Sequence, residues 1–160
     1  MSFTVATAKN QVIAAVITHQ DRIGAFRRSS EVKWDSGQWH CVTGYVPPGT
    51  SPLNQAIIEV HEETGISGDD LTLRGAAVFD KVGDDGQIWR IHAFHFASAT
   101  NELALNWEHD ASRWVTVQEF MTMPRVYWLD SVLRALYFFR HVSDETDRPQ
   151  SRETHGCGVY

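Results

Sequence analysis

The chain has 160 residues, 42% of them hydrophobic, which suits one globular domain with a sizeable core and leaves little room for a second. Its formal net charge is −6, from 14 basic and 20 acidic residues, and this balance argues against a nucleic-acid backbone as the main partner. A small phosphate substrate stays compatible with that charge, because a bound cation can bridge two negative partners.

The cysteines and the N-terminal residues bear on the cellular compartment. Cys41 and Cys157 are far apart in sequence, and Cys41 lies in an apolar run, so no disulfide framework is predicted. The best apolar run near the N-terminus, residues 12–17, is too short for a signal peptide or a membrane span. We therefore predict a cytoplasmic protein that does not bind a membrane.

The first part of the chain is predicted to form strands. Residues 12–17 are typical of a buried strand, and residues 23–26 of a second one after a turn at residues 20–22. A further strand-like run covers residues 39–46 and ends at two prolines and a glycine.

Residues 52–64 have the signals of an amphipathic helix. Ser51 is a good N-cap, Pro52 suits the first helical position, and Gly65 can adopt the left-handed conformation that ends a helix. An apolar stripe at i, i+3, i+4 and i+7 is expected to face the core: Leu53, Ala56, Ile57 and Val60.

The second part of the chain continues with strands and one helix. Residues 71–80 and 88–96 are predicted to be long strands joined by the hairpin sequence Gly-Asp-Asp-Gly at residues 83–86. Residues 113–117 are typical of a short strand, and residues 127–141 of an amphipathic helix.

The last residues differ from the rest in composition. From residue 143 onward the chain is polar and has little to bury. We predict a domain over residues 1–142 and a disordered tail over residues 143–160.

Three carboxylates form a second stripe on the predicted helix. Glu59, Glu62 and Glu63 lie together at about 100° per residue, at the edge of the buried face. Their repulsion costs roughly 0.5–1 kcal/mol without a counter-ion, and a hard divalent cation would remove that cost. Oxygen ligands favour Mg²⁺ or Mn²⁺ over Zn²⁺. Taken alone, this pattern is also compatible with an ordinary solvated acidic face.

The wider spacing resembles the Nudix box. Seven positions fall in register with that motif: Gly44, Glu59, Val60, Glu62, Glu63, Gly65 and Ile66. Thr50 stands where the family has a glutamate and Ile58 where it has an arginine. In the family these two are thought to brace the loop and orient the carboxylates, so their joint absence suggests that one bracing device was exchanged for another. The resemblance extends over roughly residues 10–140 and implies an α/β (α+β) fold, with a mixed β-sheet sandwiched between helices.

The resemblance also implies site residues. It makes Glu59, Glu62 and Glu63, with the Gly44 carbonyl, ligands of Mg²⁺ or Mn²⁺ in a hydrolase that cuts a phosphoanhydride. Glu108, in a segment similar to one that brings a late acidic residue into the family's site, is a further ligand or a base. A surface loop carboxylate is an equally weighted alternative for Glu108.

The implied substrate is a small nucleotide-like diphosphate or triphosphate, with a nucleoside or pterin ring. Three arginines are candidates for its phosphates: Arg27, Arg28 and Arg90. Four aromatic residues are candidates to stack on its ring: Trp34, Trp39, Tyr45 and Trp89. Arginines beside strands are also common as surface charges, and aromatic residues in strands are usually core residues. A homodimer is compatible with the sequence.

Two other functions share this fold. One is a nucleotide-binding or regulatory module that has lost turnover, which the changes at Thr50 and Ile58 keep open. The other is an isomerase of prenyl diphosphates, which would need an active-site cysteine. Cys41 lies inside a predicted strand and is badly placed for that role. Residues 39–44 and the Glu-His pair at Glu108 resemble one branch of the family, the dihydroneopterin-triphosphate pyrophosphatases.

Overall fold

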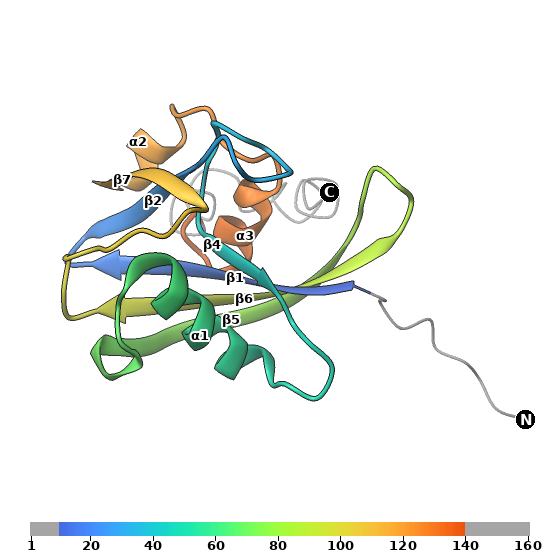
Figure 1. Ribbon diagram of the computed structural model, residues 1–160, viewed down its shortest axis with the longest axis horizontal. Helices are drawn as coiled ribbons and strands as arrows, with labels where there is room; N and C mark the ends of the chain where they lie inside the picture. The colour runs from blue at the N-terminus through green and yellow to red at the C-terminus, as the bar shows by residue number, and fades with distance from the viewer. Residues whose placement is uncertain (1–9, 140–160) are drawn as a thin grey trace, which may run out of the picture.

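The computed structural model describes residues 10–139, in which two runs of strands are each followed by helices (Figure 1). Its seven strands are β1 (Asn10–His19), β2 (Arg22–Arg28), β3 (Trp39–His40), β4 (Val42–Tyr45), β5 (Leu71–Val82), β6 (Ile88–Ser98) and β7 (His109–Val115). Its helices are α1 (Pro52–Thr64), the short 3-10 helix η1 (Gly68–Asp70), α2 (Val117–Phe120) and α3 (Leu129–Ala135).

The described strands form one mixed sheet. Its order is β3-β2-β1-β6-β5, with β4 added beside β1 and β7 beside β2. β1 and β6 pair in parallel, and the remaining pairs are antiparallel. The tight turn predicted at residues 83–86 joins β5 to β6, where the Gly83 amide donates to the Gln87 carbonyl oxygen over 2.8 Å.

β1 changes partner along its length, and this brings the segments of the site together. It pairs with β2 only through Thr18 and His19, while its first half pairs with β4, where Ile13 lies opposite Gly44. β2 turns away to pair with β7, so that Arg28 lies opposite His109 across a β-bulge. As a result, α1 packs against β4 and β1 (Figure 1), and the first residue of β7, His109, meets Glu63 of α1.

Two hydrophobic clusters cover the two faces of the sheet, because alternate residues of a strand point to opposite faces. Ala14 and Val16 of β1 pack with α2 and α3, while Ile13, Ala15 and Ile17 pack with α1. This arrangement confirms the prediction of a mixed sheet between helices. No helix in residues 10–139 has the length and hydrophobicity to cross a membrane.

The helix α1 begins and ends where its sequence predicts. The Ser51 hydroxyl accepts a hydrogen bond from the Asn54 amide over 3.1 Å, and Pro52 opens the helix. Gly65 closes it in the left-handed conformation, with φ 79° and its amide donating to the His61 carbonyl over 2.9 Å. Ala56 and Val60 are fully buried. Leu53 and Ile57 of the predicted stripe are partly buried against the same cluster.

Two predicted strands have other bounds in the structure. The strand predicted over residues 39–46 is interrupted at Cys41, because Trp39–His40 pairs with β2 and Val42–Tyr45 pairs with β1. The strand predicted over residues 113–117 begins earlier, at His109, and ends at Val115. Residue 117 starts α2 instead, since Thr116 and Glu119 form a capping box there.

The predicted C-terminal helix over residues 127–141 is shorter in the structure. α3 spans Leu129–Ala135, and Tyr137 adopts a left-handed conformation with φ 69°, which no helix interior accommodates. The tail predicted for residues 143–160 lies outside the described residues, so the domain boundary after residue 142 stays a prediction.

Candidate functional site

The three carboxylates of α1 share one side of the helix but differ in burial. The Glu63 residue is 2% exposed, Glu59 is partly buried and Glu62 is exposed. Glu63, in the last turn of α1, is the carboxylate that meets the first residue of β7, His109. The predicted stripe therefore has one buried, one partly buried and one exposed carboxylate.

Close approach between β4 and α1 requires Gly44. A Cβ atom built on Gly44 would overlap the Glu59 carboxylate, so any other residue would displace either the strand or the carboxylate. Gln55, one turn earlier on α1, donates from Nε2 to Glu59 Oε1 over 3.2 Å and helps to orient it. The box glycine thus lets the Glu59 carboxylate lie directly against the backbone of β4.

The loop that carries Glu108 is tied to the end of β2. The Glu108 amide donates to Asn106 Oδ1 over 3.0 Å, and Asn106 Nδ2 donates to Glu108 Oε2 over 3.3 Å. The Ser29 amide donates to the Glu108 carbonyl over 2.9 Å, and the Ser29 hydroxyl donates to the Trp107 carbonyl over 2.7 Å. Glu108 is therefore partly buried and held in place by both neighbours.

The electrostatics show that Glu59, Glu63 and Glu108 lie near one another. Burial raises the pKa of Glu63 to about 11, and the negative charge of Glu108 and then contact with Glu59 add to that shift. Burial also raises the pKa of Glu59, as do the charges of Glu62 and Glu108. A carboxyl with such neighbours ionises at neutral pH only when a cation compensates its charge.

His109 is buried against Glu63. His109 Nδ1 lies 3.7 Å from Glu63 Oε1, and the two side chains are 1% and 2% exposed. Burial and the positive charge of Arg28 lower the pKa of His109 to about 4. Because burial favours the neutral form of both partners, this contact is not an ion pair at neutral pH.

The donor chemistry of the site fits a hard divalent cation. Glu63 Oε2 is buried without a hydrogen-bond partner among the described residues, and the surrounding side chains offer further carboxylate oxygens. Among residues 10–139, no three acidic, histidine or cysteine side chains are already close enough together to hold an ion. A cation would therefore have to draw the carboxylates closer.

The three candidate arginines have different surroundings. The charge of Arg28 acts on Glu63, and Arg28 Nε donates to the Trp34 carbonyl over 2.8 Å. Arg27 is paired with Asp110 over 2.7 Å at the surface. The third, Arg90, is hydrogen-bonded through two nitrogens to Asp80 of the neighbouring strand, at 2.8 and 3.1 Å.

The candidate aromatic residues differ in how far they are exposed to solvent. The Trp39 residue is 9% exposed and belongs to the hydrophobic core, with Arg27 over its ring. By contrast, Trp34 and Tyr45 are each 62% exposed, and Trp89 lies beside Tyr45 with ring centroids 5.9 Å apart. A large exposed ring that the sequence did not single out is Trp107, directly before Glu108.

Some partners in the site escaped sequence reasoning, although weak signals for them exist. Gln55 precedes Glu59 by four residues, the helical spacing at which side chains meet. Asn106 precedes Glu108 by two, the spacing of an Asx turn. The contact of His109 with Glu63 joins distant segments and has no local signal. Cys41 is fully buried, and burial raises the pKa of its thiol, which confirms that it is badly placed as a nucleophile.

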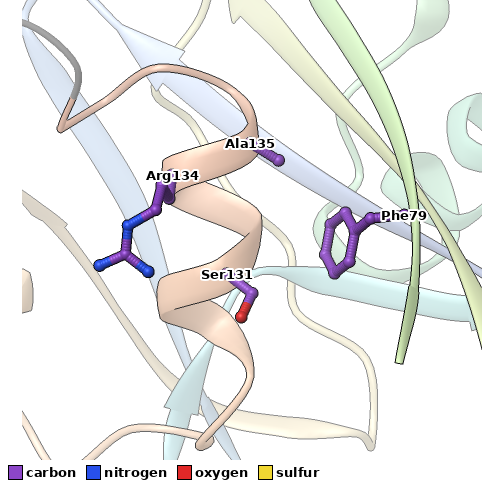
Figure 2. A pocket seen from close by; sticks show the side chains of 4 residues that line it. All are labelled: Phe79, Ser131, Arg134 and Ala135. Atoms are coloured by element: carbon purple, nitrogen blue, oxygen red, sulfur yellow. The ribbon is translucent and has the colours of Figure 1, made fainter. Parts of the chain in front are cut away.

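A small cavity lies away from these residues. It has a volume of about 90 Å³ and lies between Phe79 of β5 and the α3 residues Ser131, Arg134 and Ala135 (Figure 2). Phe79 packs on the cluster opposite α1. The cavity is therefore separate from the carboxylate site.

Comparison with known proteins places this geometry in a family. The family model described as the NUDIX domain matches residues 8–136. No curated protein sequence matches the chain.

Solved structures share the fold. An Ap4A hydrolase binary complex from C. elegans has 18% identity and a TM-score of 0.67, over 83% of this chain and 98% of that chain. The ORF135 protein of E. coli has 25% identity and a TM-score of 0.63, over 88% and 93%. The dihydroneopterin triphosphate pyrophosphohydrolase of E. coli has 21% identity and a TM-score of 0.61, over 79% and 94%. With the box glutamates on α1 and the family match over most of its length, this chain belongs to the Nudix family of pyrophosphohydrolases.

Proposed function

We propose that this protein hydrolyses a phosphoanhydride bond in a nucleoside or pterin diphosphate or triphosphate derivative, with Mg²⁺ or Mn²⁺ as its divalent ion. Nudix hydrolases use a divalent metal and act on small nucleotide-like substrates. The observation that carries the proposal is the Glu63 carboxyl, which is buried with an unpartnered oxygen while the charges of Glu59 and Glu108 act on it. Such a group needs a cation to ionise at neutral pH.

Five residues would hold the ion: Gly44 through its carbonyl, and Glu59, Glu62, Glu63 and Glu108 through their carboxylates. When bound, the ion neutralises the diphosphate, polarises a phosphorus–oxygen bond and lowers the pKa of a bound water. Gln55 orients Glu59, and Asn106 orients Glu108. Glu108 could instead act as the base, since a partly exposed carboxylate can accept a proton from the attacking water.

Arg28 is the strongest candidate to contact the substrate phosphates, because its charge already acts on Glu63. Arg27 and Arg90 would have to exchange a carboxylate partner for a phosphate. The exposed side chains of Trp34 and Trp107 are available to stack on the planar ring of a substrate. The Trp34 backbone carbonyl accepts a hydrogen bond from Arg28, and the Trp107 carbonyl accepts one from Ser29. The buried ring of Trp39 has no such face.

The substrate class is tested by incubating the full chain with a panel of nucleoside, dinucleoside and pterin phosphates, with and without Mg²⁺ or Mn²⁺. Two structural neighbours, the Ap4A hydrolase and the dihydroneopterin triphosphate pyrophosphohydrolase, support including dinucleoside polyphosphates and pterin triphosphates. We expect metal-dependent release of phosphate or pyrophosphate from at least one class. Metal-independent release, or none, would contradict the proposal.

The role of the helix carboxylates is tested by Glu62→Gln and Glu63→Gln, which keep the shape and remove the charge. We expect turnover to fall at least about 100-fold in either variant, because the metal loses a ligand. Glu102, an exposed loop carboxylate, provides the matched control as Glu102→Gln. Rates like those of the wild type in either α1 variant would show that the metal lies elsewhere.

A further inference from the structure

Glu63 needs a partner that fixes its orientation. A glutamate side chain has three rotatable bonds, so a ligating carboxylate depends on its neighbours to stay aimed at the ion. Ile58, at the position of the family's arginine, has no hydrogen-bond donor and is 45% exposed on α1. Position 58 therefore offers no donor that could orient Glu63 in this chain.

His109 of β7 lies beside Glu63. We propose that His109 is a positioning residue that holds the Glu63 carboxylate toward the metal ion, in place of the missing arginine. The Nδ1–Oε1 separation is 3.7 Å, and neither ring nitrogen nor Glu63 Oε2 has a hydrogen-bond partner among the described residues. A movement of less than about 1 Å closes the pair into a hydrogen bond. This inference rests on the proposed metal site.

The imidazole is itself held in place, as a positioning group must be. Its ring packs against Phe26, with centroids 5.5 Å apart and an interplanar angle of 48°. The backbone of His109 pairs with Arg28 at the β-bulge of β2, and its amide donates to the Asn106 carbonyl over 3.3 Å. Packing against Phe26 and backbone pairing with β2 thus hold His109 in place.

Arg28 is another basic side chain whose charge acts on Glu63, but its Nε donates a hydrogen bond to the Trp34 carbonyl. It acts on Glu63 through its charge, whereas His109 makes the contact at 3.7 Å. The two residues can therefore be separated by experiment.

The test uses binding of Mn²⁺ alone to the full chain, measured by electron paramagnetic resonance of the free ion. His109→Phe keeps a buried ring without a donor, and His109→Gln keeps a donor. We expect His109→Phe to weaken Mn²⁺ binding about 10–100-fold, the range for lost support of a metal ligand. His109→Gln should retain much of the wild-type affinity for Mn²⁺, because the amide can donate to Glu63. If the phenyl ring prevents folding, His109→Leu provides the donor-free variant.

Two controls separate positioning from packing. Ile17→Val shortens another buried side chain of the cluster that contains Phe26 and leaves the Phe26–His109 contact in place, so it should lower the melting temperature with little effect on Mn²⁺ binding. In a Glu63→Gln background, His109→Phe should weaken Mn²⁺ binding no further, because the group it positions is gone. Mn²⁺ binding like that of the wild type in His109→Phe, or equal losses in both backgrounds, would overturn the inference.

The same experiment distinguishes this inference from the proposed function. If Mn²⁺ binding depends on Glu63 and His109 as expected but the wild type cuts no substrate in the panel, the positioning role stands and the hydrolase proposal fails. If Glu63→Gln binds Mn²⁺ as tightly as wild type, the metal site itself fails and the positioning role falls with it. If activity is metal-dependent and the His109 variants bind Mn²⁺ normally, the positioning role alone is wrong.

Discussion

At the scale of single residues, the site depends on how each carboxylate is surrounded. Glu62 faces solvent, Glu59 lies against Gly44, and Glu63 is enclosed beside His109. Three glutamates within five positions of one helix thus have three environments. The exposed one can bind and release an ion with little cost, while the buried one couples ion binding to the protein interior.

The residues that depart from the family motif, Thr50 and Ile58, provide a test at this scale. If they were exchanged as a unit, Ile58→Arg or Thr50→Glu alone should help little or do harm, whereas the double variant should exceed the sum of the two. The coupling expected for contacting residues is roughly 0.5–3 kcal/mol. The measurement is a double-mutant cycle on kcat/KM and on thermal stability.

Strict additivity in both measurements would show that Thr50 and Ile58 do not communicate. A double variant that gains turnover on a substrate that the wild type binds but barely cuts would favour a binding module over an enzyme. The wild-type departures from the box would then explain the missing turnover.

At the scale of elements, the site depends on how closely β4 packs on α1. Gly44→Ala should cost about 1–3 kcal/mol of stability, because the added methyl overlaps the Glu59 carboxylate in a packed contact. It should also weaken metal-dependent turnover by displacing Glu59. Thermal unfolding and kcat measured on the same preparation check both effects.

Gly75→Ala on β5 is the matched control for this change, since its added Cβ would meet only His95 Cβ, at an ordinary 3.9 Å. It should leave turnover unchanged. Equal effects of the two substitutions would show that loss of glycine flexibility, rather than contact with Glu59, is responsible.

At the scale of the whole molecule, buried histidines make stability depend on pH. His40 is 1% exposed, and neither of its ring nitrogens has a hydrogen-bond partner among the described residues. Burial holds the pKa of His40 well below the usual 6.5. Below pH 6.5 the unfolded chain takes up a proton at this residue and the folded protein does not, so stability falls as pH decreases. The loss due to His40 between pH 7.5 and 5.5 should be on the order of 1 kcal/mol.

His40→Gln removes this titration, so unfolding of wild type and variant at the two pH values isolates its contribution. The comparison is needed because the raised pKa of Glu63 acts in the opposite direction: the folded protein retains that proton up to about pH 11, which favours folding as pH falls. Identical pH dependence in the two proteins would show that His40 is protonated in the folded state.

The C-terminal segment provides a second test at this scale. Truncation after residue 142 should leave the melting temperature and turnover essentially unchanged, because the sequence beyond it has few residues to bury. Light scattering on both lengths also tests for a homodimer. A large loss of stability, or a change of oligomeric state, would show that the segment contributes to the folded protein.

Local signals in the sequence determined the element that carries the chemistry. Ser51, Pro52 and Gly65 mark the ends of α1, and the spacing of its glutamates places them on one side, since capping and helical periodicity depend on neighbours within a few residues. The positions of most strands along the chain, the hairpin between β5 and β6 and the family were likewise predictable from the sequence alone.

Tertiary structure decided the features that depend on contacts between distant segments. The chain changes partner at Cys41 because β1 and β2 separate, which no pattern of neighbouring residues indicates. Trp39 is buried and Trp34 is exposed, although the two tryptophans are only five residues apart in sequence. The meeting of Glu63 with His109 joins residues on α1 and β7, and the electrostatics of a buried pair depend on the surfaces that exclude water from it. Sequence therefore identified the carboxylates, and the fold determined which of them is buried and what it contacts.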